Sequence, residues 1–240
     1  MIRHYLHTRL KPGAFVLLSI FLSMLVLEPD STVKKALWNC VFLLVSFFVF
    51  RLIDDAGSIR PDRIHHPDRN YLSIENFPKF CSFTALISVC YLIPLFFSSL
   101  NVGLIVLSLM ISSIGLYLLF QNRFQLLQLI PLLKYPVLLY CVIASPISMN
   151  QEFVCGSSFF IMLSYELLED KNGTWTKRIF TFISLTVAGI FSIYFSSVSY
   201  ASIFIFIPLA ISILFYRWKY IHYLPIAYYP LCVFINSFLS

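Results

Sequence analysis

The chain has 240 residues, of which 59% are hydrophobic and only 12% are charged, whereas soluble domains carry about 25% charged residues. This composition excludes a water-soluble globular domain and indicates a protein that lies in a lipid bilayer. The formal net charge of +6 is explained below by membrane topology, so it gives no support to nucleic-acid binding.

Long apolar stretches dominate the chain. A helix that crosses a bilayer needs about 20 mainly apolar residues, and the stretches predict nine such helices within one integral-membrane domain over residues 1–240. We therefore expect an all-α, multi-pass transmembrane helical bundle. In chain order, the predicted helices cover residues 12–27, 33–53, 80–99, 102–120, 126–145, 153–168, 179–196, 201–216 and 221–238.

The loops between these helices predict the orientation, because Lys and Arg accumulate on the cytoplasmic side of membrane proteins. If the N-terminus is inside, nearly all the cationic loop residues fall in inner segments, and only Lys34 and Lys35 lie outside, where Glu28, Asp30 and Glu152 also lie. We therefore expect a cytoplasmic N-terminus and an external C-terminus. The positive net charge then reflects this topology.

An unusually charged stretch, residues 51–69, follows the second predicted helix. Asp54, Ser58 and Asp62 are spaced i, i+4, i+8, and Asp55 is spaced i, i+3 from Ser58, so a continued helix would carry all four side chains on one face. Clustered acids repel unless a cation lies among them, and Mg²⁺ prefers carboxylates and often bridges to phosphates. Arginines nearby suit a diphosphate. The stretch predicts a magnesium-diphosphate site, or alternatively a solvated loop whose acids balance its arginines.

A second acidic segment, residues 164–170, ends the sixth predicted helix on the cytoplasmic side. Glu166 and Asp170 are spaced i, i+4 on one helix face, and the adjoining Tyr165 can donate a hydrogen bond to a phosphate. The alternative is that Glu169 and Asp170 are ordinary helix-end residues in cytosolic water.

Lys134 lies eight residues beyond Leu126, or about 12 Å along the fifth predicted helix. A charge at the middle of a bilayer costs about 2.5–3.5 kcal/mol on insertion scales, so we expect this side chain to face the protein interior. There it would neutralise a diphosphate or pair with an acid from a neighbouring helix. Snorkelling of its long side chain to the interface is the alternative.

The segment RLIDDAGSIRPDRIHHPDR resembles the first aspartate-rich motif of the UbiA superfamily of intramembrane prenyltransferases. That motif is written N/D-D-x-x-D-x-x-x-D, and in one bacterial branch it is preceded by Arg and followed by H-P-x-R. Ser58 stands where the family has an aspartate, while Glu166 and Asp170 match the second family motif, D-x-x-x-D, by role and spacing. The residues that match the first motif are Arg51, Asp54, Asp55, Asp62, His66, Pro67 and Arg69.

The resemblance implies a UbiA-like fold of nine helices in the cytoplasmic membrane of a bacterium, with both acidic motifs on the cytoplasmic side. It implies a Mg²⁺-dependent prenyltransferase that ionises a polyprenyl diphosphate and transfers the prenyl group to a small-molecule or lipid acceptor. The implied catalytic residues are Asp54, Asp55, Asp62 and Lys134. The implied metal ligands are Asp54, Asp55 and Asp62 for one ion and Glu166 and Asp170 for a second, and the implied diphosphate ligands are Arg51, Arg69, Lys134 and Tyr165.

Two other functions are compatible with the same scaffold. An intramembrane terpene cyclase would ionise a diphosphate at the same site and let the tail close on itself. A non-catalytic lipid-handling or transport protein is favoured by Ser58 and by the irregular second motif. Release of pyrophosphate separates either enzyme from the non-enzyme, and the product mass separates transfer from cyclisation.

Overall fold

In the computed structural model, all the regular secondary structure of the described residues is helical. The predicted all-α class is therefore confirmed for this part of the chain. The structure describes residues 5, 12–27, 31–59, 62, 73, 75–120, 129–143, 149–169, 175–193, 207–208, 210–212 and 220–239.

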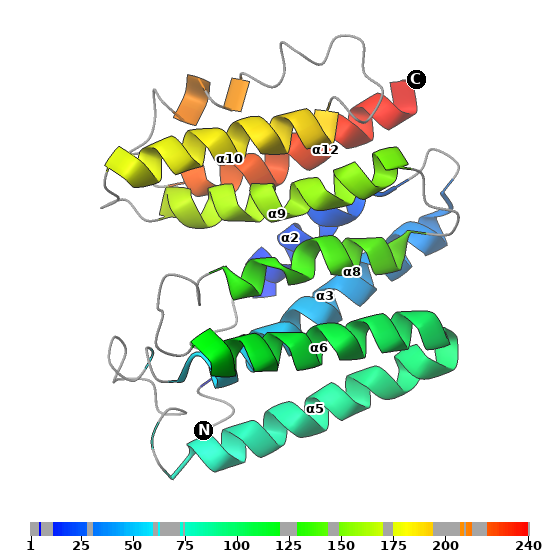
Figure 1. Cartoon of the computed structure of the whole chain (residues 1–240). Helices are drawn as coiled ribbons and strands as arrows, with labels where there is room; N and C mark the ends of the chain where they lie inside the picture. Colours follow the sequence, from blue (N-terminus) through cyan, green and yellow to red (C-terminus); the bar gives the residue numbers. More distant parts are fainter. Residues whose placement is uncertain are drawn as a thin grey trace. The chain divides into compact units, whose positions relative to one another are not determined.

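The helices follow the apolar stretches of the sequence (Figure 1). The predicted helix over residues 201–216 lies mostly outside the described residues. The observed α-helices are α2 (Pro12–Met24), α3 (Val33–Gly57), α5 (Phe77–Ser98), α6 (Leu100–Phe120), α8 (Lys134–Val142), α9 (Met149–Glu169), α10 (Trp175–Ile193) and α12 (Leu224–Leu239), and short 3-10 helices are η2 (Ile130–Leu132) and η4 (Ile221–Tyr223).

Three of these helices, α3, α5 and α6, are long and apolar enough to cross a membrane, judged by length and composition. Shorter apolar helices cover Gly13–Met24, Ile130–Val142, Arg178–Phe191 and Ile221–Ile235. Large apolar side chains such as Phe97 and Leu119 are exposed on α5 and α6, and extended apolar surfaces of this kind mark contact with lipid or with other proteins. The structure is therefore compatible with a membrane protein, and the nine-span arrangement stays a prediction.

The chain divides into two compact units, each made of two separate stretches. The first unit contains Met1–Leu17 and Phe42–Val137, and the second contains Leu18–Val41 and Leu138–Ser240. The divisions fall inside α2, α3 and α8, so neither unit is a continuous piece of chain. The single domain over residues 1–240 stays a prediction.

In the first unit, α5 and α6 form an antiparallel pair joined at Ser99 (Figure 1). Near the start of α6, Gly103 allows the ring of Phe96 to pack closely, because a Cβ at position 103 would lie 2.6 Å from that ring. The hydroxyls of Ser46 on α3 and Tyr91 on α5 are hydrogen-bonded to each other. These contacts hold α3, α5 and α6 together around the region that contains Asp54 and Asp55.

In the second unit, α9, α10 and α12 lie side by side (Figure 1). The Ser164 hydroxyl on α9 donates to the Ser184 hydroxyl on α10 over 2.9 Å, and Ser184 donates to the Phe160 carbonyl over 2.9 Å. The Tyr229 hydroxyl on α12 donates to the Leu185 carbonyl over 2.7 Å. Small hydroxyl side chains allow helices to approach closely and hydrogen-bond without water, which suits an apolar environment.

Candidate functional site

The C-terminal end of α3 carries the first acidic motif. The helix continues to Gly57, one turn beyond the predicted range 33–53, and so includes Asp54 and Asp55. Helix-type backbone bonds continue further, from the Ser58 amide to the Asp54 carbonyl (2.9 Å) and from the Asp62 amide to the Ser58 carbonyl (3.1 Å). The Ser58 hydroxyl donates to Oδ2 of Asp62 over 3.2 Å. Ser58 and Asp62 therefore share a helix face, as their i, i+4 spacing predicts.

The Asp54 carboxylate is buried and has a donor on each oxygen. Tyr117 on α6 donates its hydroxyl proton to Oδ1 over 2.9 Å, and the ammonium of Lys134 contacts Oδ2 as a hydrogen-bonded ion pair. Asp54 and Lys134 are each 5% exposed. Of the two interior roles expected for Lys134, the described contacts show the pairing with an acid of another helix. The ammonium does not reach the surface, so snorkelling does not describe it.

The Asp55 carboxylate has a different set of partners. It is 2% exposed, accepts a hydrogen bond from the Tyr5 hydroxyl over 2.9 Å, and lies 3.4 Å from Nε of Arg51, one helical turn earlier. The Tyr5 ring packs on Phe80 with centroids 5.0 Å apart. Adjacent residues on a helix point about 100° apart, so Asp54 and Asp55 face separate partners rather than one common ligand.

Tyr117 is positioned by close packing on two sides. Its ring lies over Gly57, where an added Cβ would be 2.4 Å from the ring carbons. Tyr117 and Ile130 form a buried apolar cluster with Leu116 and Phe120, through which η2 packs against α6. Glycine at position 57 is thus what allows the hydroxyl of Tyr117 to reach Asp54.

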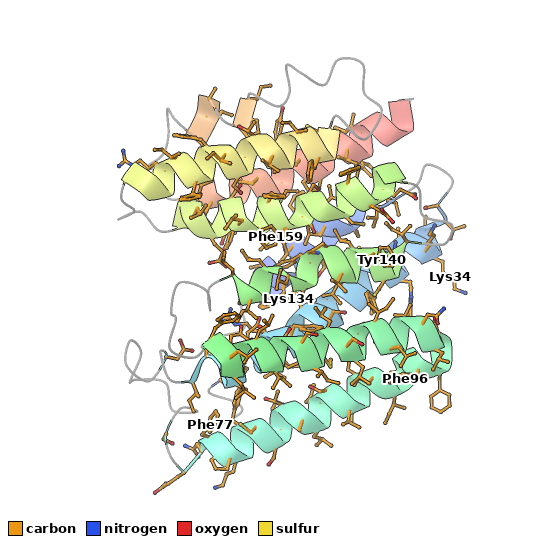
Figure 2. All side chains as sticks on the ribbon, in the orientation of Figure 1. Lys34, Phe77, Phe96, Lys134, Tyr140 and Phe159 are labelled. Atoms are coloured by element: carbon orange, nitrogen blue, oxygen red, sulfur yellow. The ribbon has the colours of Figure 1, made fainter. Side chains whose placement is uncertain are left out.

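Lys134 is the first residue of α8, and Leu133 alone separates it from η2 (Figure 2). Its ammonium also lies 5.5 Å from the centroid of the Tyr135 ring, and that ring contacts Phe47 on α3 with centroids 5.3 Å apart. A cation over an aromatic ring gains about 0.5–2 kcal/mol. The ion pair with Asp54 and the ring contact together hold the ammonium inside the first unit.

The resemblance implies that Asp54, Asp55 and Asp62 hold Mg²⁺, and the contacts test this implication. Each oxygen of Asp54 already accepts a hydrogen bond, from Tyr117 or from Lys134. Among the described residues, no three His, Cys, Asp or Glu side chains come together as a metal site. A unit positive charge repels a divalent cation about 4 Å away by roughly 8 kcal/mol at an effective dielectric constant of about 20, which cancels the attraction of one carboxylate at the same distance. The described arrangement therefore does not fit Mg²⁺ at Asp54.

Residues 164–169 of the second acidic segment lie on α9 in the second unit. Glu166 is exposed, and the ring of Tyr165 packs against His222 and Tyr223, with centroids 5.2 and 5.8 Å away. The phosphate contact expected for Tyr165 stays a prediction. Several of the expected site residues lie outside the described residues: His66, Pro67, Arg69 and Asp170.

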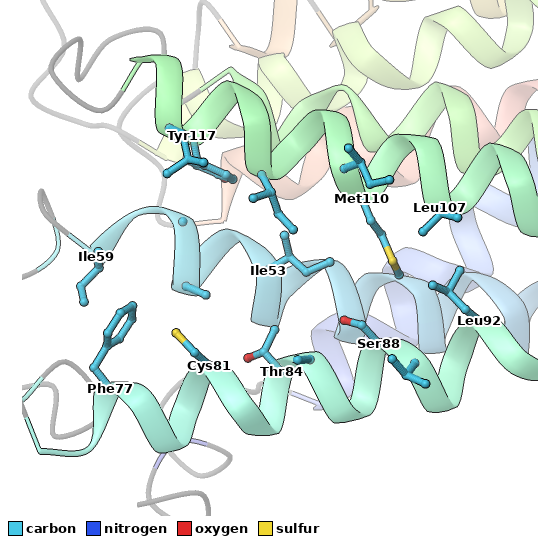
Figure 3. A pocket seen from close by; sticks show the side chains of 17 residues that line it. Ile53, Ile59, Phe77, Cys81, Thr84, Ser88, Leu92, Leu107, Met110 and Tyr117 are labelled. Carbon is cyan, nitrogen blue, oxygen red and sulfur yellow. The ribbon is translucent and has the colours of Figure 1, made fainter.

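An apolar cavity of about 660 Å³ lies in the first unit between α3, α5 and α6 (Figure 3). Its volume is within the range of about 300–1,000 Å³ that is usual for small-molecule sites. Ile59 and Phe77 lie at one end, and Leu92 and Leu107 lie at the other (Figure 3). Between Phe77 and Leu92, α5 rises by about 22 Å. The cavity thus has the length and lining that suit an extended hydrocarbon chain.

The cavity adjoins the carboxylates and also opens outward. Tyr117 lines it and donates its hydroxyl proton to Asp54. Two other lining residues, Ile111 and Leu118, are 61% and 65% exposed, so the cavity opens on the outer apolar surface of α6. The lining hydroxyl of Thr84 donates to the Phe80 carbonyl over 3.0 Å, which leaves the wall effectively apolar.

Sequence reasoning did not identify two residues of this region, Tyr5 and Tyr117. Both place a hydroxyl on a carboxylate of α3 from positions 50 and 63 residues away in the chain. A tyrosine within the apolar stretch of α6 was the available signal for Tyr117, because a buried phenol usually finds a hydrogen-bond partner. The identity of that partner depends on the fold.

Comparison of the chain with models of known protein families, with curated proteins and with solved structures gives no significant match.

Proposed function

We propose that the protein is an intramembrane prenyltransferase of the UbiA type, which takes a polyprenyl diphosphate and transfers the prenyl group to an acceptor. The observation that carries this proposal is the apolar cavity that adjoins Asp54 through the side chain of Tyr117. An isoprenoid tail matches the cavity, and a charged headgroup matches the polar cluster at its end. A lipid substrate would enter through the apolar opening beside Ile111 and Leu118.

In the proposed reaction, the allylic C–O bond breaks and its electron pair leaves with the diphosphate. A nucleophile of the acceptor attacks the prenyl cation and then loses a proton. Arg51 and Lys134 would stabilise the charge that develops on the diphosphate, because an ammonium has three N–H donors and a guanidinium has five. Preorganised charges of this kind usually give the largest single contribution to catalysis. An apolar cavity would keep water away from the cation.

The remaining parts of the proposal rest on the resemblance. They include dependence on Mg²⁺, nine spans, a bacterial cytoplasmic membrane and acidic motifs that face the cytoplasm. The site roles that rest on it are those of Asp62, Arg69, Tyr165, Glu166 and Asp170. Because the described carboxylates do not fit a metal, we derive no step of the reaction through Mg²⁺.

The test is a titration of the purified protein in nanodiscs with geranylgeranyl diphosphate, with and without Mg²⁺, followed by a pyrophosphate-release assay on the same sample. Saturable binding with release of pyrophosphate supports an ionising enzyme. A product with the mass of a prenylated acceptor supports transfer. A cyclic hydrocarbon product that contains no acceptor supports the terpene cyclase. Failure to bind prenyl diphosphates of any chain length contradicts the proposal.

A matched pair of variants on α5 tests the cavity itself. Ser88→Trp places a large ring in the cavity, which Ser88 lines, and should abolish binding. Ile93→Trp adds the same ring to an exposed position of α5 that does not line the cavity, and binding should be retained. Equal binding by both variants would show that the tail lies elsewhere.

One observation favours the non-catalytic, lipid-handling alternative. Asp54 and Asp55 each already contact a cation of the protein, Lys134 or Arg51, which resembles a structural arrangement as much as a catalytic one. A protein of this kind would bind the prenyl diphosphate and release it chemically intact. Binding without pyrophosphate release in the presence of a panel of aromatic, quinone-precursor and lipid acceptors would favour it over the enzyme.

A further inference from the structure

The ion pair of Asp54 with Lys134 differs from what the resemblance implies, which is Mg²⁺ at this carboxylate. We propose that the Lys134 ammonium takes the place of a metal ion at Asp54, so that the diphosphate headgroup is held there without a divalent cation. The nature of the ligand rests on the proposed function. The replacement of a metal by a lysine can be tested without knowing the ligand.

The position of Lys134 is unfavourable for a cation except for its contacts with Asp54 and with the Tyr135 ring. It is the first residue of α8, where the helix dipole is positive, and it is 5% exposed, so its ammonium has lost most of its hydration. The carboxylate of Asp54 is the anion that offsets both effects. The charge on Lys134 is therefore stabilised by the Asp54 carboxylate, whereas the helix dipole at this position would favour a neutral side chain.

The same side chain positions both members of the ion pair. Tyr117 donates to Asp54 and packs against Ile130 of η2, and Lys134 lies two residues after the end of η2. Gly57 leaves the space that the Tyr117 ring needs. The ammonium is thus fixed at the carboxylate by the packing of α6 against η2, in the way that a protein fixes a bound ion.

The charges of the cluster also balance without a metal. Asp54 and Asp55 contribute two negative charges, and Arg51 and Lys134 contribute two positive ones, so the sum is zero. Ser58 removes one negative charge relative to the family motif, and a lysine carries one positive charge fewer than Mg²⁺. The lost carboxylate at Ser58 and the lower charge of an ammonium relative to Mg²⁺ therefore offset each other in the local charge.

The experiment uses the full chain in nanodiscs, with Mn²⁺ as a paramagnetic probe and with the melting temperature measured in Mg²⁺ and in chelator. For the wild type we expect no Mn²⁺ bound at Asp54 and no shift of the melting temperature by Mg²⁺. Lys134→Met removes the charge and keeps much of the length, so it should lower the melting temperature, create Mn²⁺ binding and let Mg²⁺ restore part of the loss. The double variant Asp54→Asn/Lys134→Met should show neither response.

Two outcomes overturn the proposal. One is Mn²⁺ binding by the wild type that is lost in the double variant, which removes both charges together and decides the question even if Lys134→Met does not fold. The other is a folded Lys134→Met protein that binds no more Mn²⁺ than the wild type. Any Mn²⁺ held elsewhere in the chain is equal in all samples and cancels in these comparisons.

A parallel titration with geranylgeranyl diphosphate separates failure of this inference from failure of the proposed function. Binding by the wild type that persists in chelator supports the inference and the prenyl diphosphate site of the proposed function, and it contradicts dependence of binding on Mg²⁺. Binding that the chelator abolishes supports the proposed function and overturns the inference. Absence of binding in either condition contradicts the proposed function, and the Mn²⁺ comparison then decides the inference alone.

Discussion

The acids at the end of α3 and the acid near the end of α9 lie in contrasting surroundings. Asp54 and Asp55 are buried, and each contacts a cation and a tyrosine hydroxyl. Glu166, in the second unit, is exposed although apolar residues flank it. Burial of an ionised carboxylate is costly unless it is paired and hydrogen-bonded. The burial of Asp54 and Asp55 is thus accompanied by an ion pair and a tyrosine hydrogen bond for each carboxylate.

The largest effect should come from removing one member of the buried ion pair. Asp54→Ala leaves the Lys134 ammonium buried without its carboxylate, and we expect a loss of about 3–5 kcal/mol in the free energy of unfolding. Glu166→Ala should change it by less than about 0.5 kcal/mol, as is usual for exposed positions. Unfolding by denaturant in detergent micelles measures the free energy of unfolding of both variants. Similar losses in the two variants would contradict the expected difference between the two regions.

Tyrosine hydroxyls allow the two units to be compared directly. Tyr117→Phe takes a donor from the Asp54 carboxylate, with an expected loss of about 1.5–3 kcal/mol because the acceptor is charged. Tyr229→Phe in the second unit takes a donor from the neutral Leu185 carbonyl, with an expected loss of about 0.5–1.5 kcal/mol. The same unfolding measurement ranks the pair, and a larger loss for Tyr229→Phe would reverse the expected order.

Gly57→Ala should act on the carboxylate indirectly. The added Cβ would lie 2.4 Å from the Tyr117 ring, so the ring must move, at an expected cost of about 1–3 kcal/mol. Gly115→Ala on α6 is the matched control, because its Cβ would have no neighbour within 4 Å, and it should stabilise the helix by up to about 1 kcal/mol. Combining Gly57→Ala with Tyr117→Phe should cost less than the sum of the two changes, which a double-mutant cycle measures.

The smallest effect on stability, and the most informative about metals, is expected at Ser58. Ser58→Asp places a second carboxylate one helical turn from Asp62, in place of the hydroxyl that now donates to it. Without metal, this like-charge pair should cost about 0.2–0.5 kcal/mol. With Mg²⁺ the variant should gain melting temperature, because a divalent cation would bridge the new carboxylate and that of Asp62 and relieve their repulsion.

Ser58→Asn is the control for this change, since it is similar in size to aspartate and carries no charge. It should show no response to Mg²⁺. A flat response of Ser58→Asp as well would mean that this helix face does not point toward a cation site.

Hydrophobic patterning predicts the helices of the described residues better than it predicts their lengths. The predicted range 33–53 ends where the apolar run ends, but α3 continues to Gly57 because Asp54 and Asp55 find partners that permit their burial. The predicted helix over residues 126–145 is instead shortened, since Pro131 lies in the 3-10 helix η2 and the α-helix starts at Lys134. The hydrophobic pattern indicates the length of an apolar run in the sequence. The residues at which a helix begins and ends also depend on contacts with distant residues and on the positions of prolines.

The sequence pointed to Asp54, Asp55 and Lys134 as residues of interest, but it predicted neither their pairings nor the contacts of Tyr5 and Tyr117. The spacing of Ser58 and Asp62 predicts their contact, which is local and observed. The ion pair of Asp54 with Lys134 was one of two interior roles that burial alone allowed for this lysine. The choice between them, and the arrival of Tyr5 and Tyr117 at the carboxylates, depend on contacts between residues 50 to 80 positions apart, which a local pattern does not encode.

The wide separation of Asp54 and Lys134 has a consequence for the biogenesis of the protein. Arg51 and Tyr5 precede Asp55 in the chain and are available as soon as it is made, whereas Lys134 follows Asp54 by 80 residues. At a synthesis rate of about 5–20 residues per second, Lys134 is made roughly 4–16 seconds after Asp54. During that interval the end of α3 carries a carboxylate without its cation, which is costly to bury. Its final burial therefore belongs to a late step of folding, after Lys134 has been made.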